Sequence, residues 1–333
     1  AIGAVSACTL AHAAFADSIE DFYRGKTVTM TISAGPGNGV DTNARLIGRY
    51  LGNYIPGKPN IVMRNMPGAG HVIASNYVYN EAPRDGTSLL ATLGNIMSYQ
   101  IMGGRGVRYD ASKFTWLGSS ESDNSLIFTW KTSSVTSLAQ ATKIPVTMGA
   151  TGAGSTTYVY PLLLNKLFGT KFKIISGYKS DNEINFALEK GEVQGRAGLF
   201  YNVLTGIHPD WLSDHKIHLL AQIGLESLNA LPTVPSLLSF AKTDEQRQIL
   251  TLYVGAYSVG RPLITTPGVP ADRVSALRKA FDQTMNDPGF LDDAKKRGMH
   301  VSPTNGEKTQ RIVTAYFSTS PAIVEKAKKL LGP

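Results

Sequence analysis

Short stretches with a strand pattern recur along the chain, and glycines and then an apolar stripe at helical spacing follow several of them. Residues 27–32 (TVTMTI) have the strand pattern, residues 33–39 are glycine-rich, and a helix follows them. Residues 60–65 and 88–93 repeat the strand pattern, with a helical stretch between them. Strands that alternate with helices predict an α/β fold whose sheet is mixed but mostly parallel.

The same arrangement returns in the middle of the chain. Residues 144–148 predict a strand, residues 149–154 a glycine-rich loop and residues 155–168 a helix. Further strands and helices follow at 172–175, 182–189, around Val193 and at 217–222. Beyond a proline-rich segment at 231–235, two amphipathic helices are expected at 271–285 and 305–329, with turns at 287–289 and 302–303 between them.

The length of 333 residues is about twice that of a usual single domain, so two lobes with separate cores are expected. We place the chain crossings near Ser122 and Glu226. The first lobe then comprises residues 17–121 and 226–333, the second comprises the inserted residues 122–225, and a ligand cleft is expected between them.

The first 16 residues have the character of an export signal from which the charged front is missing. They are apolar, and Ala14-Phe15-Ala16 offers the small residues that a signal peptidase accepts, so we expect cleavage after Ala16 and export to the periplasm. The alternatives are a buried N-terminal helix and lipidation at Cys8. Because Cys8 is the only cysteine, the mature chain has no thiol for catalysis or metal binding. No apolar run of about 18 residues follows the signal, so no membrane span is expected.

The net charge of +8 favours anionic ligands or surfaces. Nucleic acid is an alternative, but the lysines and arginines are scattered and no RNP, zinc-finger or basic-zipper motif is found, so we expect no nucleic-acid partner.

The two glycine-rich loops, one in each expected lobe, are the strongest candidate site. A helix N-terminus exposes unpaired N–H groups and a partial positive charge, which attract a carboxylate or phosphate. In open α/β sheets, ligands bind at the carboxyl ends of the strands, where these loops lie. Two such loops facing each other could hold a dianion without a buried cation. Each loop alone is also compatible with a purely structural turn.

Enzymatic chemistry finds no support in the sequence. The pattern Gly35-x-Gly37-x-Gly39 lacks the last glycine of the dinucleotide-binding motif, because Val40 stands there. His208, His215 and His218, near Asp210 and Asp214, match no zinc motif. No nucleophile with a neighbouring base can be identified. We expect neither catalysis, cofactor nor metal.

Several segments together resemble the Bug family, the substrate-binding proteins of tripartite tricarboxylate transporters. The resemblance lies in GPGNGVDTNAR (35–45), RNMPGAG (64–70) and APRDGTSLL (82–90), with shorter matches at 154–156, 177–179, 191–193, 231–235 and 267–270. It covers nearly the whole mature chain. It implies a two-lobed, type II-like Venus-flytrap protein of the periplasm that binds a small carboxylate and delivers it to a membrane transporter.

The resemblance also implies ligand positions, which rely mainly on backbone N–H groups, hydroxyls and waters. Carried over to this chain, they are Pro36, Gly37, Asn38, Gly39, Asn95, Ser98, Gly154, Ser155, Thr156, Thr157 and Tyr178. The chain departs from the family at Gln194-Gly195-Arg196-Ala197-Gly198, where many members have an aspartate. Arg196 either contacts a distal carboxylate of the ligand or forms a surface ion pair.

Two rival functions share parts of this pattern. A nicotinamide-dependent dehydrogenase would use a doubly wound sheet, and a ligand-sensing module would use the same cleft to signal to a receptor. We expect a monomer that binds a di- or tricarboxylate or a related organic acid, but the sequence does not choose the acid.

Overall fold

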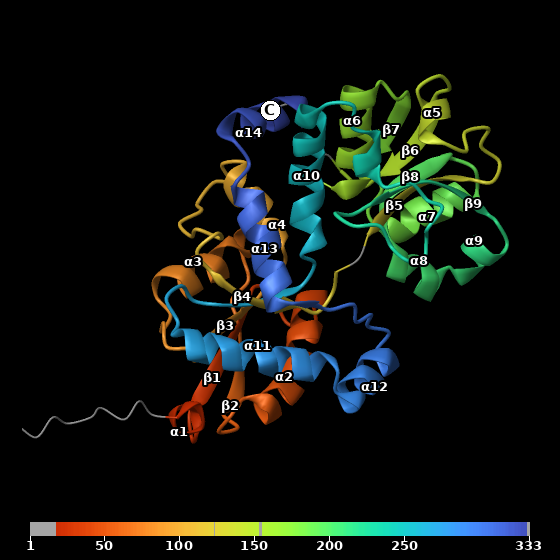
Figure 1. The fold of residues 1–333 in the computed structure, drawn as a ribbon. Coiled ribbons are helices and arrows are strands. Elements are labelled where there is room, and N and C mark those ends of the chain that lie inside the picture. Colours follow the sequence, from red (N-terminus) through yellow and green to blue (C-terminus); the bar gives the residue numbers. More distant parts are fainter. Residues whose placement is uncertain (1–17, 123, 153–154, 332–333) are drawn as a thin grey trace, which may run out of the picture.

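Two α/β lobes lie side by side in the computed structural model, which describes residues 18–122, 124–152 and 155–331 (Figure 1). Each lobe is built on one sheet. The first sheet contains β1 (Thr27–Ile32), β2 (Asn60–Asn65), β3 (Ser88–Ala91), β4 (Thr115–Ser119), β10 (Pro262–Thr265) and β11 (Thr304–Asn305). The second contains β5 (Ser125–Trp130), β6 (Val146–Ala150), β7 (Phe172–Ser176), β8 (Gly195–Phe200) and β9 (Ile217–Ile223).

Both sheets are mixed, as predicted, and they share one strand order. The first runs β11-β4-β10-β3-β1-β2 and the second β7-β6-β8-β5-β9. In each sheet the three strand-and-helix units are parallel, namely β2-β1-β3 and β7-β6-β8. The strand next to each of these units, β10 or β5, is antiparallel to its neighbours. The two lobes therefore repeat one topology.

Helices cover both faces of the first sheet. One face packs on α2 (Gly39–Tyr54), α11 (Ala271–Met285) and α12 (Pro288–Lys296). The opposite face packs on α3 (Val72–Asn80), α4 (Asn95–Ile101), α10 (Asp244–Ser258) and α13 (Gly306–Phe317). Successive residues of β3 point to opposite faces of the sheet. Leu89 therefore packs on the side of α2 and α11, and Leu90 packs on the side of α4 and α10. The short α1 (Ile19–Tyr23) closes one end, where Tyr23 is buried.

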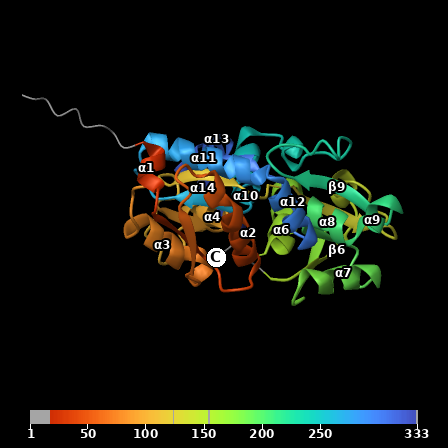
Figure 2. The ribbon, with the colours of Figure 1, turned by 90° about the horizontal axis from the view of Figure 1, so that it is seen from below.

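The second sheet is covered in the same way. On one face lie α5 (Leu138–Ala141) and α6 (Thr156–Phe168), and on the other lie α7 (Asp181–Glu189), α8 (Tyr201–Ile207) and α9 (Pro209–Ser213). Seen from below, most elements of the two sets lie in opposite halves of the view, although α12 overlaps the second set (Figure 2). The second face is built around Trp130 and Trp211, whose ring centroids are 5.1 Å apart.

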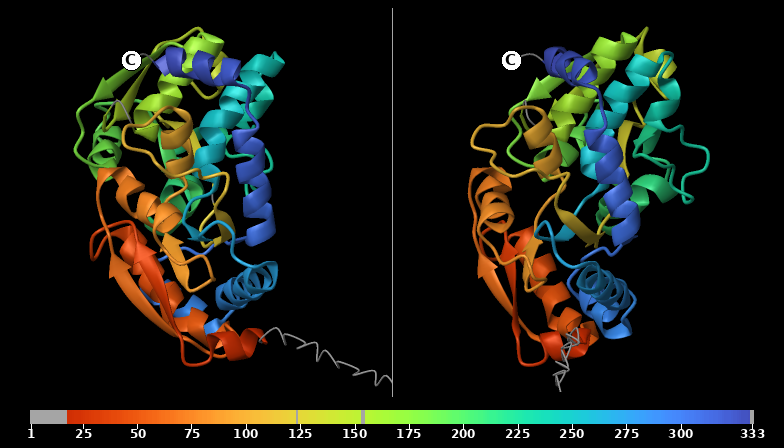
Figure 3. Two further views of the ribbon diagram at one scale, coloured as in Figure 1. Left: turned by 90° about the vertical axis from the view of Figure 1, so that its left-hand side faces the viewer. Right: turned by 60° about the vertical axis from the view of Figure 1, so that its left-hand side comes forward.

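Helices α10 and α14 (Pro321–Leu331) join the two lobes. The last helix, α14, packs on both α10 and α6, and Figure 3 shows it lying across the top of the molecule. The Tyr253 hydroxyl in α10 donates to the Ala327 carbonyl (2.7 Å), and the Gln246 side chain donates to the Leu167 carbonyl of α6 (3.1 Å). One hydrophobic cluster runs continuously through both lobes as a result.

Two predictions for the C-terminal helices were wrong in detail. The predicted turn at 287–289 is the start of α12, because Asp287 caps the Phe290 N–H (2.8 Å) and Pro288 occupies the first helical turn, which tolerates proline. The predicted helix 305–329 is two helices, α13 and α14, with Pro321 at the start of α14. The helix α10 was not predicted.

Two adjacent segments, 119–122 and 258–261, run between the lobes. The Ser120 N–H donates to the Arg261 carbonyl (3.1 Å), and a Cβ on Gly260 would lie 2.4 Å from the Glu121 carbonyl oxygen. Residues after Glu226 stay near β9, where the Gln222 N–H donates to the Pro235 carbonyl (2.9 Å). The lobe boundaries at 122 and 226 stay a prediction, and this contact places residues up to Pro235 beside the second sheet. Among the described residues, no helix is both long and apolar enough to cross a membrane.

Candidate functional site

The two predicted loops follow β1 and β6, which hold equivalent places in the two sheets, at the carboxyl ends of these strands. The first connects β1 to α2 and the second connects β6 to α6. Gly154, one of the predicted ligand positions, lies outside the described residues. The other predicted positions are all described, and they differ in what surrounds them.

The first loop is braced by its own carboxylate. Asp41, 2% exposed, accepts hydrogen bonds from the Gly37 N–H (2.8 Å), the Arg45 side chain (2.9 Å) and the Asn65 side chain (2.7 Å). Burial raises the pKa of Asp41, but these three hydrogen bonds outweigh it and hold the pKa below its usual value. Gly37 has φ of +79°, a conformation that favours glycine.

The tip of this loop is exposed, so its predicted ligand positions are free to meet a ligand. Pro36, Gly37, Asn38 and Gly39 are all exposed. The Asn38 side chain accepts from the Val40 N–H (2.9 Å) and so caps α2.

The end of β3 brings further polar groups to the same edge of the first sheet. The buried side-chain oxygens of Thr92 (Oγ1) and Asn95 (Oδ1) have no hydrogen-bond partner among the described residues. Such orphaned oxygens are uncommon in proteins and need an explanation, such as a water or ligand. The Ser98 hydroxyl donates to the Asn95 carbonyl (2.9 Å), which fixes the first turn of α4. Asn95 and Ser98 were predicted as ligand positions, and Thr92 was not.

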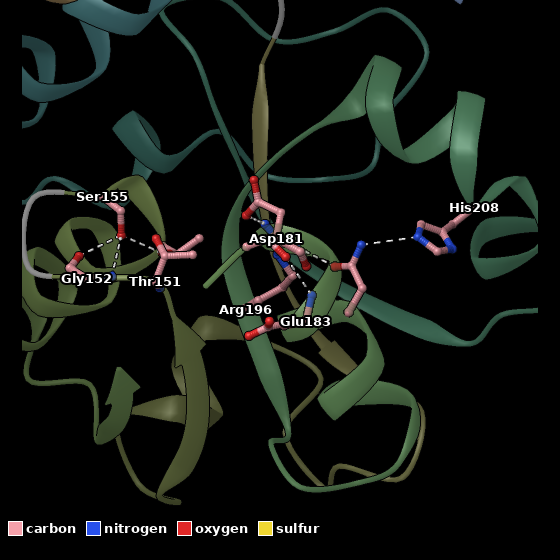
Figure 4. Close-up of polar contacts among 10 residues, drawn as sticks. Thr151, Gly152, Ser155, Asp181, Glu183, Arg196 and His208 are labelled. Atoms are coloured by element: carbon pink, nitrogen blue, oxygen red, sulfur yellow. Dashed lines mark hydrogen bonds and ion pairs between the residues drawn. The ribbon is translucent and has the colours of Figure 1, made fainter. Parts of the chain in front are cut away.

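Three hydroxyls form a cluster in the second loop (Figure 4). Thr157 Oγ1, on a residue 2% exposed, accepts from the Thr151 N–H (3.0 Å) and lies 2.6 Å from Ser155 Oγ and 3.3 Å from Thr151 Oγ1. Ser155 Oγ also donates to the Gly152 carbonyl (2.7 Å). Because its hydroxyl turns toward Gly152, Ser155 stands at the N-cap of α6 without capping it. The first N–H groups of α6 therefore keep their attraction for an anion.

The remaining two predicted residues of the second loop region pack inward. A Cβ on Gly198 would lie 2.5 Å from Thr156 Oγ1, so the Thr156 side chain lies against β8. Tyr178 is partly buried over Gly149, and burial raises the pKa of its hydroxyl.

Arg196 is fully buried, at 0% exposed, beneath the start of α7 (Figure 4). Its Nη2 pairs with Asp181 Oδ1 (2.6 Å), and its Nη1 donates to the Asp181 carbonyl (3.2 Å) and to Asn185 Oδ1. Its Nε has no partner among the described residues. Burial lowers the pKa of Arg196, and Asp181 offsets part of this effect. An ion pair was one of the two predicted roles, but only Asp181, 62% exposed, lies at the surface.

A polar chain between the lobes was missed by the sequence analysis. Arg261 Nε pairs with Glu121 Oε2 (2.7 Å), and Arg261 Nη1 donates to the Gly39 carbonyl (3.0 Å). The other oxygen of Glu121 accepts from Asn202 Nδ2 (3.2 Å), at the start of α8 in the second lobe. These partners are 81 to 222 residues apart in sequence, so no local pattern predicts them.

The histidines near position 210 have structural contacts. The His208 ring stacks on Trp211 with centroids 4.1 Å apart, and Asp210 pairs with Lys216 (2.6 Å). Among the described residues, no group of three or more His, Cys, Asp or Glu side chains is placed to hold a metal ion.

Solved structures place this arrangement among known folds, although the sequence matches no family model and no curated protein. A TctC solute-binding protein from Polaromonas, solved without ligand, is similar with a TM-score of 0.73 at 18% identity, over 91% of this chain and 99% of that chain. The periplasmic binding protein BugD is similar with a TM-score of 0.56 at 19% identity, over 92% and 98% of the two chains. MatC from Rhodopseudomonas palustris, with bound malate, gives 0.52 at 19% identity, over 92% and 99%. The chain therefore has the two-lobed fold of the TctC- and Bug-type periplasmic solute-binding proteins.

Proposed function

We propose that this chain is an exported solute-binding protein that captures a small carboxylate between its lobes and delivers it to a tripartite tricarboxylate transporter. The observation that carries the proposal is the pair of loops at the carboxyl edges of two sheets with the same strand order. The first loop presents the exposed tip 36–39, and the second presents an α6 start that no described side chain caps.

Recognition on this account uses neutral groups and one helix N-terminus. The N–H groups at the start of α6 and the hydroxyls of Ser155 and Thr157 would bind one end of the ligand in the second lobe. The tip 36–39 and the orphaned oxygens of Thr92 and Asn95 would bind the hydroxyls, protonated groups or ordered waters of the ligand in the first lobe. A ligand that contacts both lobes at once binds the closed form more tightly and so shifts the chain toward closure.

The proposed ligand class and the proposed transporter partner are supported by the similarity of fold and by the family resemblance of the loop motifs. MatC was solved with malate, a dicarboxylate, and the TctC-type protein is described as a solute-binding protein. The net charge of +8 also favours an anionic solute. Lobe closure around such a ligand would create the surface that the membrane partner recognises.

A thermal-shift screen of residues 17–333 tests the proposal. The compounds are mono-, di- and tricarboxylates, aromatic acids and acidic amino acids, with the corresponding amides and methyl esters as uncharged controls. A ligand at 100 times its Kd adds about 2.7 kcal/mol of stability, which a melting curve detects readily. We expect at least one carboxylate to raise the melting temperature while its amide does not. The proposal is overturned if no acid raises the melting temperature.

A further inference from the structure

We propose that Arg261, on the segment between the lobes, binds the distal carboxylate of the ligand and so makes the site select diacids over monoacids. This inference rests on the proposed function and deepens it, because it assigns a charged specificity group to a site otherwise built from amides and hydroxyls.

Two of the three guanidinium nitrogens of Arg261 have partners among the described residues, and the third has none. Arg261 Nε pairs with Glu121 Oε2 (2.7 Å), and Nη1 donates to the Gly39 carbonyl (3.0 Å). Its Nη2 carries two further N–H donors, for which no described residue provides an acceptor. The side chain is 31% exposed, and a solute that binds Nη2 leaves the bonds of Nε and Nη1 in place.

The position of Arg261 relative to the loops supports the assignment. Nη2 lies 3.4 Å from where a Cβ on Gly39 would stand, so it is beside the tip of the first loop. Glu121, which holds Arg261, also accepts from Asn202 in the second lobe (3.2 Å). The Gly94 N–H, just before Asn95, donates to the carbonyl of Gly260, the residue before Arg261 (3.3 Å). The guanidinium therefore lies where both lobes and the β3–α4 loop meet.

Other cations near the loops are less suited to this role. Arg196 is 0% exposed, and Asp181 and Asn185 occupy its terminal nitrogens. Arg45 already forms an ion pair with the buried carboxylate of Asp41 (2.9 Å). Lys179, exposed in the β7–α7 loop of the second lobe, is a further rival, but its flexible ammonium lacks the fixed planar geometry that suits a carboxylate.

Matched ligand pairs test the proposal. Malate and 2-hydroxybutyrate differ only in the replacement of the distal carboxylate by a methyl group, and adipate and hexanoate differ in the same way. Calorimetric titration would compare the intact mature chain with the variants R261Q, R261K and K179Q. R49Q is the control, because Arg49 forms a similar ion pair with Asp293 (2.7 Å) on the outer face of the first lobe.

We expect R261Q to weaken binding of the preferred diacid about 30-fold, the loss of one charge-assisted hydrogen bond, and to weaken binding of its monoacid analogue less than about threefold. R261K should recover part of the preference, and R49Q and K179Q should leave it unchanged. Circular dichroism and melting curves show whether each variant is folded. If R261Q does not fold, the comparison of R261K with the wild-type chain tests the role of Arg261.

Three results would overturn the inference while leaving carboxylate binding intact. They are equal affinity of the wild-type chain for diacid and monoacid, an equal loss of both in R261Q, and loss of the preference in K179Q. A wild-type chain that binds none of the acids in the screen overturns the proposed function itself, which separates the two failures.

Discussion

The two lobes repeat one strand order, yet each braces its ligand loops with a buried charge of opposite sign. In the first lobe, Asp41 at 2% exposed holds the β1–α2 loop through Gly37, Arg45 and Asn65. In the second lobe, Arg196 at 0% exposed holds the start of α7 through Asp181 and Asn185. The same topology therefore supports different chemistry at its two carboxyl edges.

This difference shows where an anion would find free donors. The Gly37 N–H in the first loop is already bonded to Asp41, so this amide cannot also serve a ligand carboxylate directly. The α6 start in the second loop is left uncapped by the described side chains, and Thr151, Ser155 and Thr157 carry no charge. We infer that the second loop binds an anion through amide N–H groups. On the side of the first loop, Arg261 attracts the anion instead.

Removal of the buried arginine should give the largest effect. R196A leaves the buried Asn185 without its strongest donor and opens a cavity, so we expect a loss of about 3 kcal/mol in the free energy of unfolding in urea. D210N is the matched control and should cost less than about 1 kcal/mol, because Asp210 and Lys216 form an ion pair at the surface of the same lobe (2.6 Å). Equal costs for the two variants would mean that burial of Arg196 is not what braces this lobe.

Removal of the buried acid should give the next effect and a characteristic pH dependence. D41N presents an amide where three donors meet a carboxylate, and we expect a loss of about 2 kcal/mol at pH 7. The folded-state pKa of Asp41 lies below its usual value, so its ionised form stabilises the fold above the unfolded pKa of about 4. The stability gap between wild type and D41N should be constant above about pH 5 and should shrink as the pH falls through the folded pKa.

Urea unfolding at a series of pH values measures this gap. A gap that widens on acidification would contradict the account, since it would require the protonated form of Asp41 to be the stabilising one. R45Q should remove only part of the effect, because Arg45 is half exposed and supplies one of the three bonds.

The smallest effect on stability is expected in the hydroxyl cluster. T157V keeps the shape of a buried side chain but removes the acceptor for the Thr151 N–H, which should cost about 1 kcal/mol. Carboxylate affinity should fall about tenfold, since the ligand loses the Thr157 hydroxyl and the loop around the α6 start loses its shape. T314V, at an exposed hydroxyl of α13 away from both loops, should change neither quantity measurably. Unaltered affinity in T157V would remove this cluster from the binding site.

The elements with strong local patterns could be predicted from the sequence. The strands 27–32 and 60–65 and the helix 271–285 have the predicted bounds, because alternation and helical spacing are properties of neighbouring residues. The missed helix α10 carries a usable local signal. Thr243 caps the Gln246 N–H (3.2 Å), and the Gln246 side chain accepts from the Lys242 N–H (2.8 Å), close to the capping-box pattern.

The site was only partly predictable, because its decisive contacts are long-range. The loop glycines and Asn95 stand in local motifs, whereas the pairing of Arg261 with Glu121 depends on two segments that meet only in the folded chain. Burial is equally invisible in sequence. Arg196 was a candidate because the chain departs there from the family pattern, in which many members have an aspartate, but only the fold shows that α7 covers it.

Small-angle X-ray scattering of the mature chain, with and without a saturating carboxylate from the screen, tests the central claim most directly. The claim is that one carboxylate contacts both lobes and holds them closed. We predict that the radius of gyration falls on ligand addition, and that it does not fall with the corresponding amide. A carboxylate that binds tightly by calorimetry yet leaves the radius of gyration unchanged would contradict the claim.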